Sequence, residues 1–167
     1  MNYTAIIIAC LVVATILVVA KLAIDYSVKR QTLDNGKTVK GIVLPLRLQA
    51  YERMALFLER IEPNQLVMRI HNNGLNVAQE QNLLLTAIRS EFEHNLSQQI
   101  YISSPVWNQI SGAKDDIIDI IDAVAKTFEP TDDSLAFAEA LLAAAAEKPV
   151  VYQAMALLKA DVQRLFY

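Results

Sequence analysis

The chain begins with a long run of apolar positions and continues with apolar and polar positions interspersed. Of residues 1–24, 20 are apolar, and residues 1–20 contain no charged side chain. About 20 apolar residues, at a rise of about 1.5 Å each, cross the ~30 Å hydrocarbon core of a bilayer. The pattern therefore predicts a transmembrane helix over residues 1–24, with the ammonium group of Lys21 reaching the lipid headgroups.

A cleaved signal peptide is the alternative interpretation of this segment. Such a peptide has a basic start, a shorter apolar core and small residues at an A-x-A-like cleavage site. No Lys or Arg precedes the apolar run, and no clear cleavage site follows it. We therefore expect the segment to remain as an uncleaved anchor.

Turn and capping signals divide the rest of the chain into helices. Asp34–Lys37 has the composition of a turn that ends the anchor helix or its extension, and Pro45 suits the first turn of a helix. Asn76 and Gln79 have the spacing of a capping box, and Thr131 or Asp132 is the expected cap after Pro130. Together with the other prolines, these signals predict helices over residues 45–61, 64–71, 76–101, 104–128, 131–146 and 149–166.

The predicted fold is all-α, with an N-terminal transmembrane helix followed by a cytoplasmic bundle of about five helices. It divides into an anchor over 1–24, a basic juxtamembrane segment over 25–44 and a helical domain over 45–167. Residues 38–44 are ambiguous. A short strand at 98–103 is an alternative to helix, because β-branched and aromatic residues favour strands.

Helical projection at about 100° per residue gives the segment 105–128 two distinct faces. Its acidic side chains lie opposite an apolar stripe, which predicts a helix packed on the core. The stripe consists of Val106, Ile110, Ala113, Ile117, Ile121, Val124 and Phe128.

Several polar side chains project onto apolar faces. In the helix 77–101, Asn95 and Gln99 fall within the apolar stripe and Arg89 lies at its edge, while Asp161 projects among apolar residues of the last helix. A buried amide without a partner costs about 1–3 kcal/mol. We therefore expect these side chains to bond to another helix or to a partner chain, and Arg89 and Asp161 to neutralise each other.

The net charge of −3 is unevenly distributed. Residues 21–60, here called the basic collar, carry a net +4, and residues 61–167 carry a net −7. The positive-inside rule then predicts that the N-terminus lies outside and the helical domain lies in the cytoplasm. We expect the collar to attract anionic lipid, whereas the acidic domain argues against binding of nucleic acid.

No motif in the chain predicts catalysis, a cofactor or a metal. Glu91 and His94 form one Glu-x-x-His spacing, but di-iron bundles use two such motifs with further glutamates. We interpret this pair as solvated or as part of an interface. The acidic run at 115–122 lacks the loop carbonyls of a calcium site and is expected to be a solvated face. Cys10, the single cysteine, lies in the predicted span and excludes an intrachain disulfide.

The candidate functional residues are the polar side chains of the runs 47–53 and 91–99, together with Arg89 and Asp161. We expect them to form a network between helices or an exposed interaction surface. They are Gln49, Tyr51, Glu52, Arg53, Arg89, Glu91, His94, Asn95, Gln98, Gln99 and Asp161.

The runs PLRLQAYERMALFLERI (45–61), EFEHNLSQQIY (91–101) and LLKADVQRLF (157–166), with Trp107 and Ile110 between them, carry a family resemblance. The sequence resembles, over roughly 45–167, an uncharacterised family of small single-span membrane proteins from Bacteroidota-type bacteria. The resemblance implies a bacterial origin, one membrane span and a mainly helical body. It implies no activity, so no catalytic or binding residue is carried over.

These observations favour a non-enzymatic, membrane-anchored helical scaffold or accessory subunit of a bacterial inner-membrane assembly. Its expected partners are membrane lipid, through 1–24 and the basic collar, and a membrane protein or further copies of the chain. Two alternatives remain: a homo-oligomer that organises anionic lipid, and an enzyme with a Glu/His site around Glu91 and His94.

Overall fold

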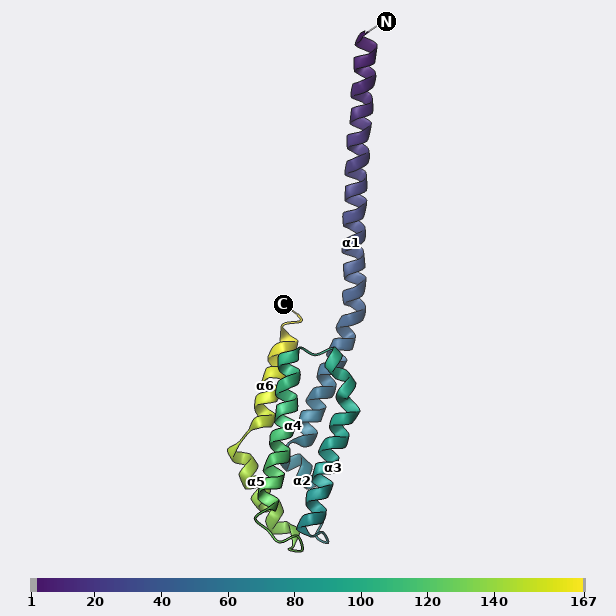
Figure 1. Ribbon diagram of the computed structural model, residues 1–167. Helices are drawn as coiled ribbons and strands as arrows, with labels where there is room; N and C mark the ends of the chain where they lie inside the picture. The colour runs from purple at the N-terminus through teal and green to yellow at the C-terminus, as the bar shows by residue number, and fades with distance from the viewer. Residues whose placement is uncertain (1–2, 167) are drawn as a thin grey trace. The chain divides into compact units, whose positions relative to one another are not determined.

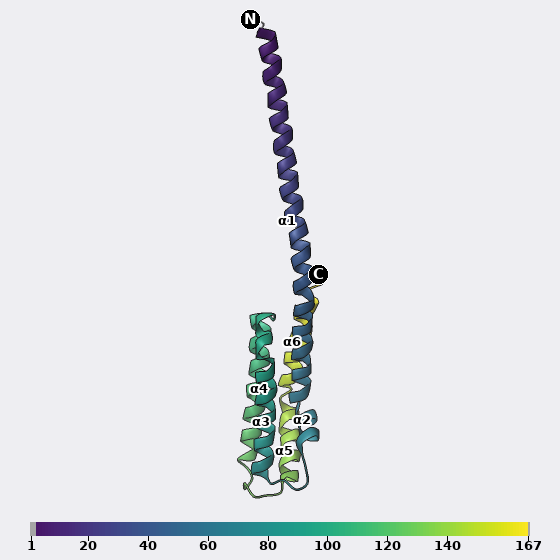
Figure 2. The ribbon, with the colours of Figure 1, turned by 90° about the vertical axis from the view of Figure 1, so that its right-hand side faces the viewer.

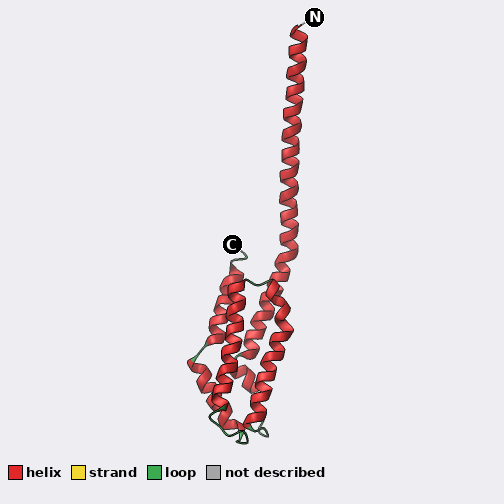
Figure 3. Ribbon diagram, viewed as in Figure 1, coloured by secondary structure: helices red, strands yellow, loops and turns green. Residues whose placement is uncertain are grey.

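The computed structural model describes residues 3–166, except for the side chains of residues 4–10, 12, 28 and 30–40. Over this part of the chain the regular structure is helical, and no strand is present beyond one isolated bridge between Asn76 and Asp133 (Figure 3). The all-α prediction is therefore confirmed. The helices are α1 (Tyr3–Ile61), α2 (Pro63–Ile70), α3 (Val77–Asn95), the 3-10 helix η1 (Leu96–Ile100), α4 (Ser104–Ala125), α5 (Ser134–Glu147) and α6 (Val150–Gln163) (Figure 1).

The chain divides into two compact units, Met1–Leu44 and Pro45–Tyr167. The first unit is the N-terminal part of α1. Helix α1 continues through 34–37, where the sequence predicts a turn, and through 38–44, where the sequence is ambiguous. The predicted turn is therefore wrong. Each of the two glycines, Gly36 and Gly41, costs a helix only about 1 kcal/mol relative to alanine, which does not by itself end a long helix.

Over the described residues, no single helix combines the length and the apolar composition needed to cross a bilayer. Helices α5 and α6 reach that length and composition only as a pair, which is bent by 48°. Residues 1–2 of the predicted span, and the side chains of 4–10 and 12, lie outside the described part of the chain. The transmembrane anchor therefore remains a prediction.

Pro45 lies inside α1 and not at the first turn of a separate helix, as the sequence pattern had predicted. The helix ends at Ile61, where Pro63 begins α2. The carboxylate of Glu62 caps α2 by accepting a hydrogen bond from the Gln65 amide at 3.0 Å. The predicted stop at Glu62 and Pro63 is thus confirmed.

The capping box at the start of α3 is also confirmed. The Asn76 side chain accepts from the Gln79 amide at 2.9 Å, and the Gln79 side chain accepts from the Asn76 amide at 3.1 Å. The helix then ends at Asn95, earlier than predicted, and continues as η1. Because residues 98–100 are helical and 101–103 form a turn and loop, the alternative of a short strand is wrong.

Helix α4 packs against α3, α5 and α6 in the second unit. In Figure 2 it lies with α3 on one side of the bundle, across from α5 and α6. Five members of its predicted stripe, from Val106 to Ile121, are buried, whereas Val124 and Phe128 are only partly buried. The Phe92 ring of α3 extends this core toward α1 and α4, with its centroid 5.6 Å from Phe57 and 5.5 Å from Trp107.

Two loops meet at one end of the bundle. The amides of Val77 and Ala78 donate to the carbonyls of Asp132 and Pro130, at 3.0 and 3.1 Å. The N-cap of α5 is Asp133, whose carboxylate accepts from the Leu135 amide at 3.0 Å, and not Thr131 or Asp132 as predicted. Asp132 has another role, because its carboxylate accepts from the Glu129 amide at 2.9 Å within the loop.

A glycine inside α4 gives a direct test of this packing. A Cβ added at Gly112 would meet nothing within 4 Å, so Gly112→Ala should raise the free energy of unfolding by about 0.5–1 kcal/mol through helix propensity alone. The measurement is urea unfolding of the full chain, followed by the fluorescence of Trp107, its one tryptophan. The reverse change in the same helix, Ala123→Gly, should lower the stability by a similar amount. A loss of stability in Gly112→Ala would mean that α4 is more tightly enclosed at this position.

Candidate functional site

The structure separates the candidate polar residues into two bonded clusters and a set of solvent-facing side chains. Tyr51 and Asp161, which lie on helices far apart in sequence, come together in the first cluster. Glu91 and Asn95 belong to the second, which also includes Arg60. The remaining candidates make few or no polar contacts among the described residues.

The first cluster joins α1, α6 and the residue that precedes α4. The Tyr51 hydroxyl donates to Asp161 Oδ2 at 2.5 Å, and the Ser103 hydroxyl donates to the same oxygen at 2.7 Å. Arg47 Nε donates to the Tyr101 carbonyl at 3.1 Å, and its Nη2 reaches the Tyr51 hydroxyl at 3.4 Å. The Tyr51 side chain is buried, and its hydrogen bonds lie where the surroundings are partly buried.

The charges in this cluster are tuned by their surroundings. Burial raises the pKa of Asp161, but the hydrogen bonds from Tyr51 and Ser103 and the positive charges of Arg164 and Arg47 outweigh it and leave the pKa below its ordinary value. Burial also raises the pKa of Tyr51, and the adjacent Asp161 carboxylate raises it further. The cluster therefore places a neutral phenol beside an ionised carboxylate. This arrangement stabilises the fold and does not activate either group as a base.

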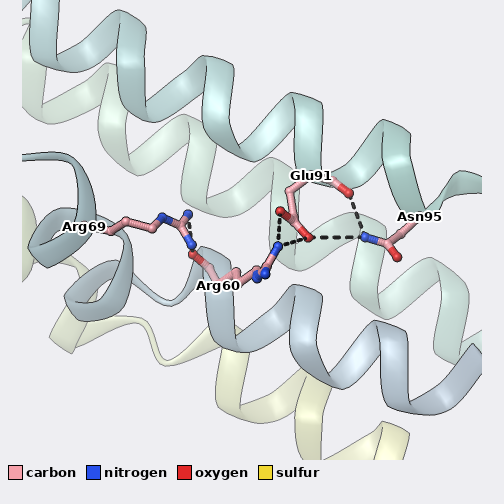
Figure 4. A network of polar contacts seen from close by, with 4 residues as sticks. All are labelled: Arg60, Arg69, Glu91 and Asn95. Atoms are coloured by element: carbon pink, nitrogen blue, oxygen red, sulfur yellow. Dashed lines mark hydrogen bonds and ion pairs between the residues drawn. The ribbon is translucent and has the colours of Figure 1, made fainter. Parts of the chain in front are cut away.

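The second cluster lies between α1 and α3 (Figure 4). Arg60 Nη1 donates to both oxygens of the Glu91 carboxylate, at 2.9 and 2.8 Å. The Asn95 side-chain amide donates to the Glu91 carbonyl at 2.9 Å and lies 3.5 Å from Glu91 Oε1. Arg69 Nη2 donates to the Arg60 carbonyl at 3.3 Å and links α2 to the end of α1.

Two expectations about these polar residues are corrected. Asn95 is buried as predicted, but its side chain bonds within α3 and does not reach another helix. Asp161 bonds to Tyr51 and Ser103, whereas Arg89 is exposed and has no polar contact with it among the described residues. Arg89 lies at the outer edge of the apolar stripe of α3, and its position around the helix directs its side chain to solvent.

The other candidates face solvent or are partly covered. Arg53 and Gln98 are half-buried, and Gln98 Nε2 donates to the Ser97 hydroxyl at 3.2 Å. The exposed candidates are Gln49, Glu52, His94 and Gln99. His94 and Glu91 share one helix but not one site, because the Glu91 carboxylate is engaged by Arg60.

One further polar pair was missed by sequence reasoning. Glu80 is fully buried, and its carboxylate lies 3.0 Å from Nδ1 of His71, which follows α2. No local spacing connects the two, so only the packing of α2 on α3 reveals the pair. Among the described residues, no group of three His, Cys, Asp or Glu side chains is placed to hold a metal ion.

A groove of about 850 Å³ lies between α1, α2 and α6. Its apolar lining is unusually accessible, because Met68 is 80% exposed, Tyr152 66% and Leu56 50%. Charged side chains also line it: Glu59 and Arg60 of α1, Glu62 and Arg69 beside or within α2, and Lys159 of α6. Sequence reasoning missed this site, since its apolar members are isolated positions on three helices.

The hydrogen bond of Tyr51 should stabilise the bundle in a pH-dependent way. Tyr51→Phe keeps the buried ring and removes the donor, and we expect it to lower the free energy of unfolding by about 1–2 kcal/mol at pH 7. Because the pKa of Asp161 is lowered from about 3.8, the ionised carboxylate stabilises the folded state above that value, and this contribution disappears as the pH falls through and below it.

Trp107 fluorescence during urea unfolding at pH 7 and pH 3 measures this effect. Tyr51→Phe should lose less stability between the two pH values than the wild type does, because Asp161 then titrates closer to its ordinary pKa. Tyr152→Phe is the matched control, since this exposed phenol has no hydrogen bond among the described residues. Equal acid sensitivity in wild type and Tyr51→Phe would contradict the role given to the bond.

The buried amide of Asn95 leads to a second stability prediction. Asn95→Leu removes the hydrogen bond of a buried polar side chain at the end of α3. We expect this change to lower the free energy of unfolding by about 1 kcal/mol. Gln99→Leu is the matched control, because this amide is exposed and should change the stability little. The same unfolding assay compares the two variants, and an unchanged unfolding curve for Asn95→Leu would show that the bond contributes nothing.

Comparison with known proteins gives a family but no activity. Neither the curated proteins nor the solved structures include a match to the chain. A profile described as a family of unknown function, DUF7935, matches residues 1–165. The chain therefore belongs to this family of unknown function, DUF7935.

Proposed function

We propose that the protein is a membrane-anchored helical interaction module, a scaffold or accessory subunit of a membrane assembly, without catalytic activity of its own. The observation that carries the proposal is the groove between α1, α2 and α6. Three of its apolar side chains, Leu56, Met68 and Tyr152, are each at least half exposed.

The convergence of these side chains is what favours binding. Single exposed apolar residues are common on soluble domains, whereas apolar side chains that gather in one concave site are typical of interaction surfaces. Methionine is flexible and polarisable, so Met68 and Met155 adapt to a partner surface at little cost. Tyr152 offers a large apolar ring with a polar end, which is favoured at interfaces.

The polar clusters support binding over catalysis. The Glu91 carboxylate is held by Arg60, and the Asp161 carboxylate is held by Tyr51 and Ser103. His94 is exposed and does not line the groove. The alternative Glu/His enzyme would need these groups directed together into one concave site.

The membrane part of the proposal rests on the sequence. The pattern of 20 apolar positions in residues 1–24 predicts one span, and residues 21–60 carry the positive charge that favours the cytoplasmic side. In this topology the N-terminus lies outside the bacterial inner membrane and the domain 45–167 lies in the cytoplasm. A lipid-organising homo-oligomer remains the alternative, and it depends on collar side chains of which Arg30, Lys37 and Lys40 lie outside the described residues.

Affinity purification from gently solubilised native membranes tests the proposal. The tagged full chain should stay in the membrane pellet after an alkaline carbonate wash and should co-purify with one reproducible set of membrane proteins, identified by mass spectrometry. Met68→Glu should deplete that set at least fivefold, because it places an unpaired charge in the apolar groove.

Ile100→Glu is the matched control, since Ile100 is 74% exposed in η1 and does not line the groove. It should recover the same proteins as the wild type. Recovery of a lone monomer from wild-type membranes, or an unchanged set with Met68→Glu, would overturn the proposal.

A further inference from the structure

We propose that His71 and Glu80 form a pH-sensitive latch, which holds the end of α2 on α3 while His71 is protonated and releases it as the pH rises. The latch is carried by the geometry of this buried pair and does not rest on the proposed function. Its release would nevertheless change the groove, because Met68 and Arg69 of α2 are part of the lining.

The Glu80 carboxylate is completely enclosed, since the side chain has 0% exposure. Its two oxygens lie 3.0 and 3.2 Å from Nδ1 of His71. Among the described residues, no other hydrogen bond or ion pair reaches this carboxylate. A buried charge without a counter-charge is strongly destabilising, so the fold depends on His71 to compensate it.

The charge state of the pair follows from its position and its chemistry. Glu80 lies in the first turn of α3, where the helix dipole favours a negative charge. An imidazole is also a stronger base than a carboxylate. The proton that the two groups share therefore resides on the ring, and the pair is neutral as a whole.

No second charge competes with His71 for this carboxylate. Helices α2, α4 and α5 pack against α3, and the buried side chains of α5 are all uncharged. Within residues 63–147, the other charged side chains are exposed, apart from three that are bonded elsewhere. These three are Glu91, Lys114 and Asp122, which are bonded to Arg60, Asp115 and Gln81.

The ring of His71 is held on one side only. Its Nε2 is buried and has no hydrogen-bond partner among the described residues. The side chain is 19% exposed, which gives the ring a route to water. If the ring turned outward, Nε2 would gain a hydrogen bond that it lacks inside. The inward position of the ring therefore depends on its attraction to the Glu80 charge.

A rise in pH removes this attraction. The stabilisation is complete below about pH 6.5, where a histidine in an unfolded chain is protonated as well. It is lost as the pH rises further and the ring in the folded state gives up its proton, because Glu80 then carries an uncompensated buried charge. The carboxylate regains water only when His71 and the end of α2 move away from α3.

Hydrogen exchange of the full chain in a mild non-ionic detergent tests the latch. Protection factors, corrected for the intrinsic exchange rate at each pH, are compared at pH 6.0 and pH 8.5. We expect peptides from residues 63–71 to lose protection at least tenfold between these values, whereas peptides from the buried part of α4 should stay within twofold. Equal changes in the two helices, or no change in either, would overturn the proposal.

Glu80→Gln should remove the pH dependence, because a neutral amide leaves no buried charge when the ring loses its proton. His94→Asn is the matched control, since His94 is the second of the two histidines in the chain and is exposed. This variant should keep the wild-type response. A response that survives Glu80→Gln, or one that disappears in His94→Asn, would count against the latch decisively.

A measurement on the wild type needs no stable variant at Glu80. Two-dimensional NMR of the ring nitrogens distinguishes charged from neutral histidine, and the spectrum of His94→Asn assigns the two signals. The His71 ring should lose its charge over the same pH range in which α2 loses protection. Loss of protection at a pH where the His71 signal does not change would show that another group controls α2.

Discussion

The packing of α6 beside α1, which line the groove together, includes a partly buried hydrogen bond between these first and last helices of the bundle. Tyr51 of α1 and Asp161 of α6 are 110 residues apart in sequence, and they meet at 2.5 Å. Because the phenol is buried, its hydroxyl would lose a partner if α6 moved away, and a buried unsatisfied donor is costly. The bond therefore holds α6 beside α1, where the two helices form facing walls.

The polar clusters and the groove have complementary roles. Within the bundle, carboxylates are matched to hydroxyl, guanidinium and amide donors: Glu91 and Asp161 join helices, and Glu62 caps α2. At the groove, by contrast, apolar side chains are exposed, and Lys159 and Glu59 have no polar partner within the described residues. A surface of this kind lowers its free energy by covering apolar area and pairing charge, which is why we propose binding and not chemistry.

Local signals along the chain were reliable where they act over a few residues. The capping box at Asn76 and the stop at Pro63 were placed correctly, because their physical cause is a backbone donor or its absence within one turn. The turn expected at 34–37 and the separate helix expected at Pro45 were wrong. A turn composition only lowers helix propensity, and a long helix on both sides outweighs so small a bias.

The sequence by itself determined the all-α class, most helix boundaries and the buried stripe of α4. It also placed Tyr51, Glu91, Asn95 and Asp161 among the residues of interest. Only the tertiary structure decided how they pair, since partners such as Arg60 and Ser103 lie far from them in the sequence. The groove likewise has no signature in the sequence, because exposure of Met68 and Tyr152 depends on how α1, α2 and α6 pack and not on the periodicity within any one of them.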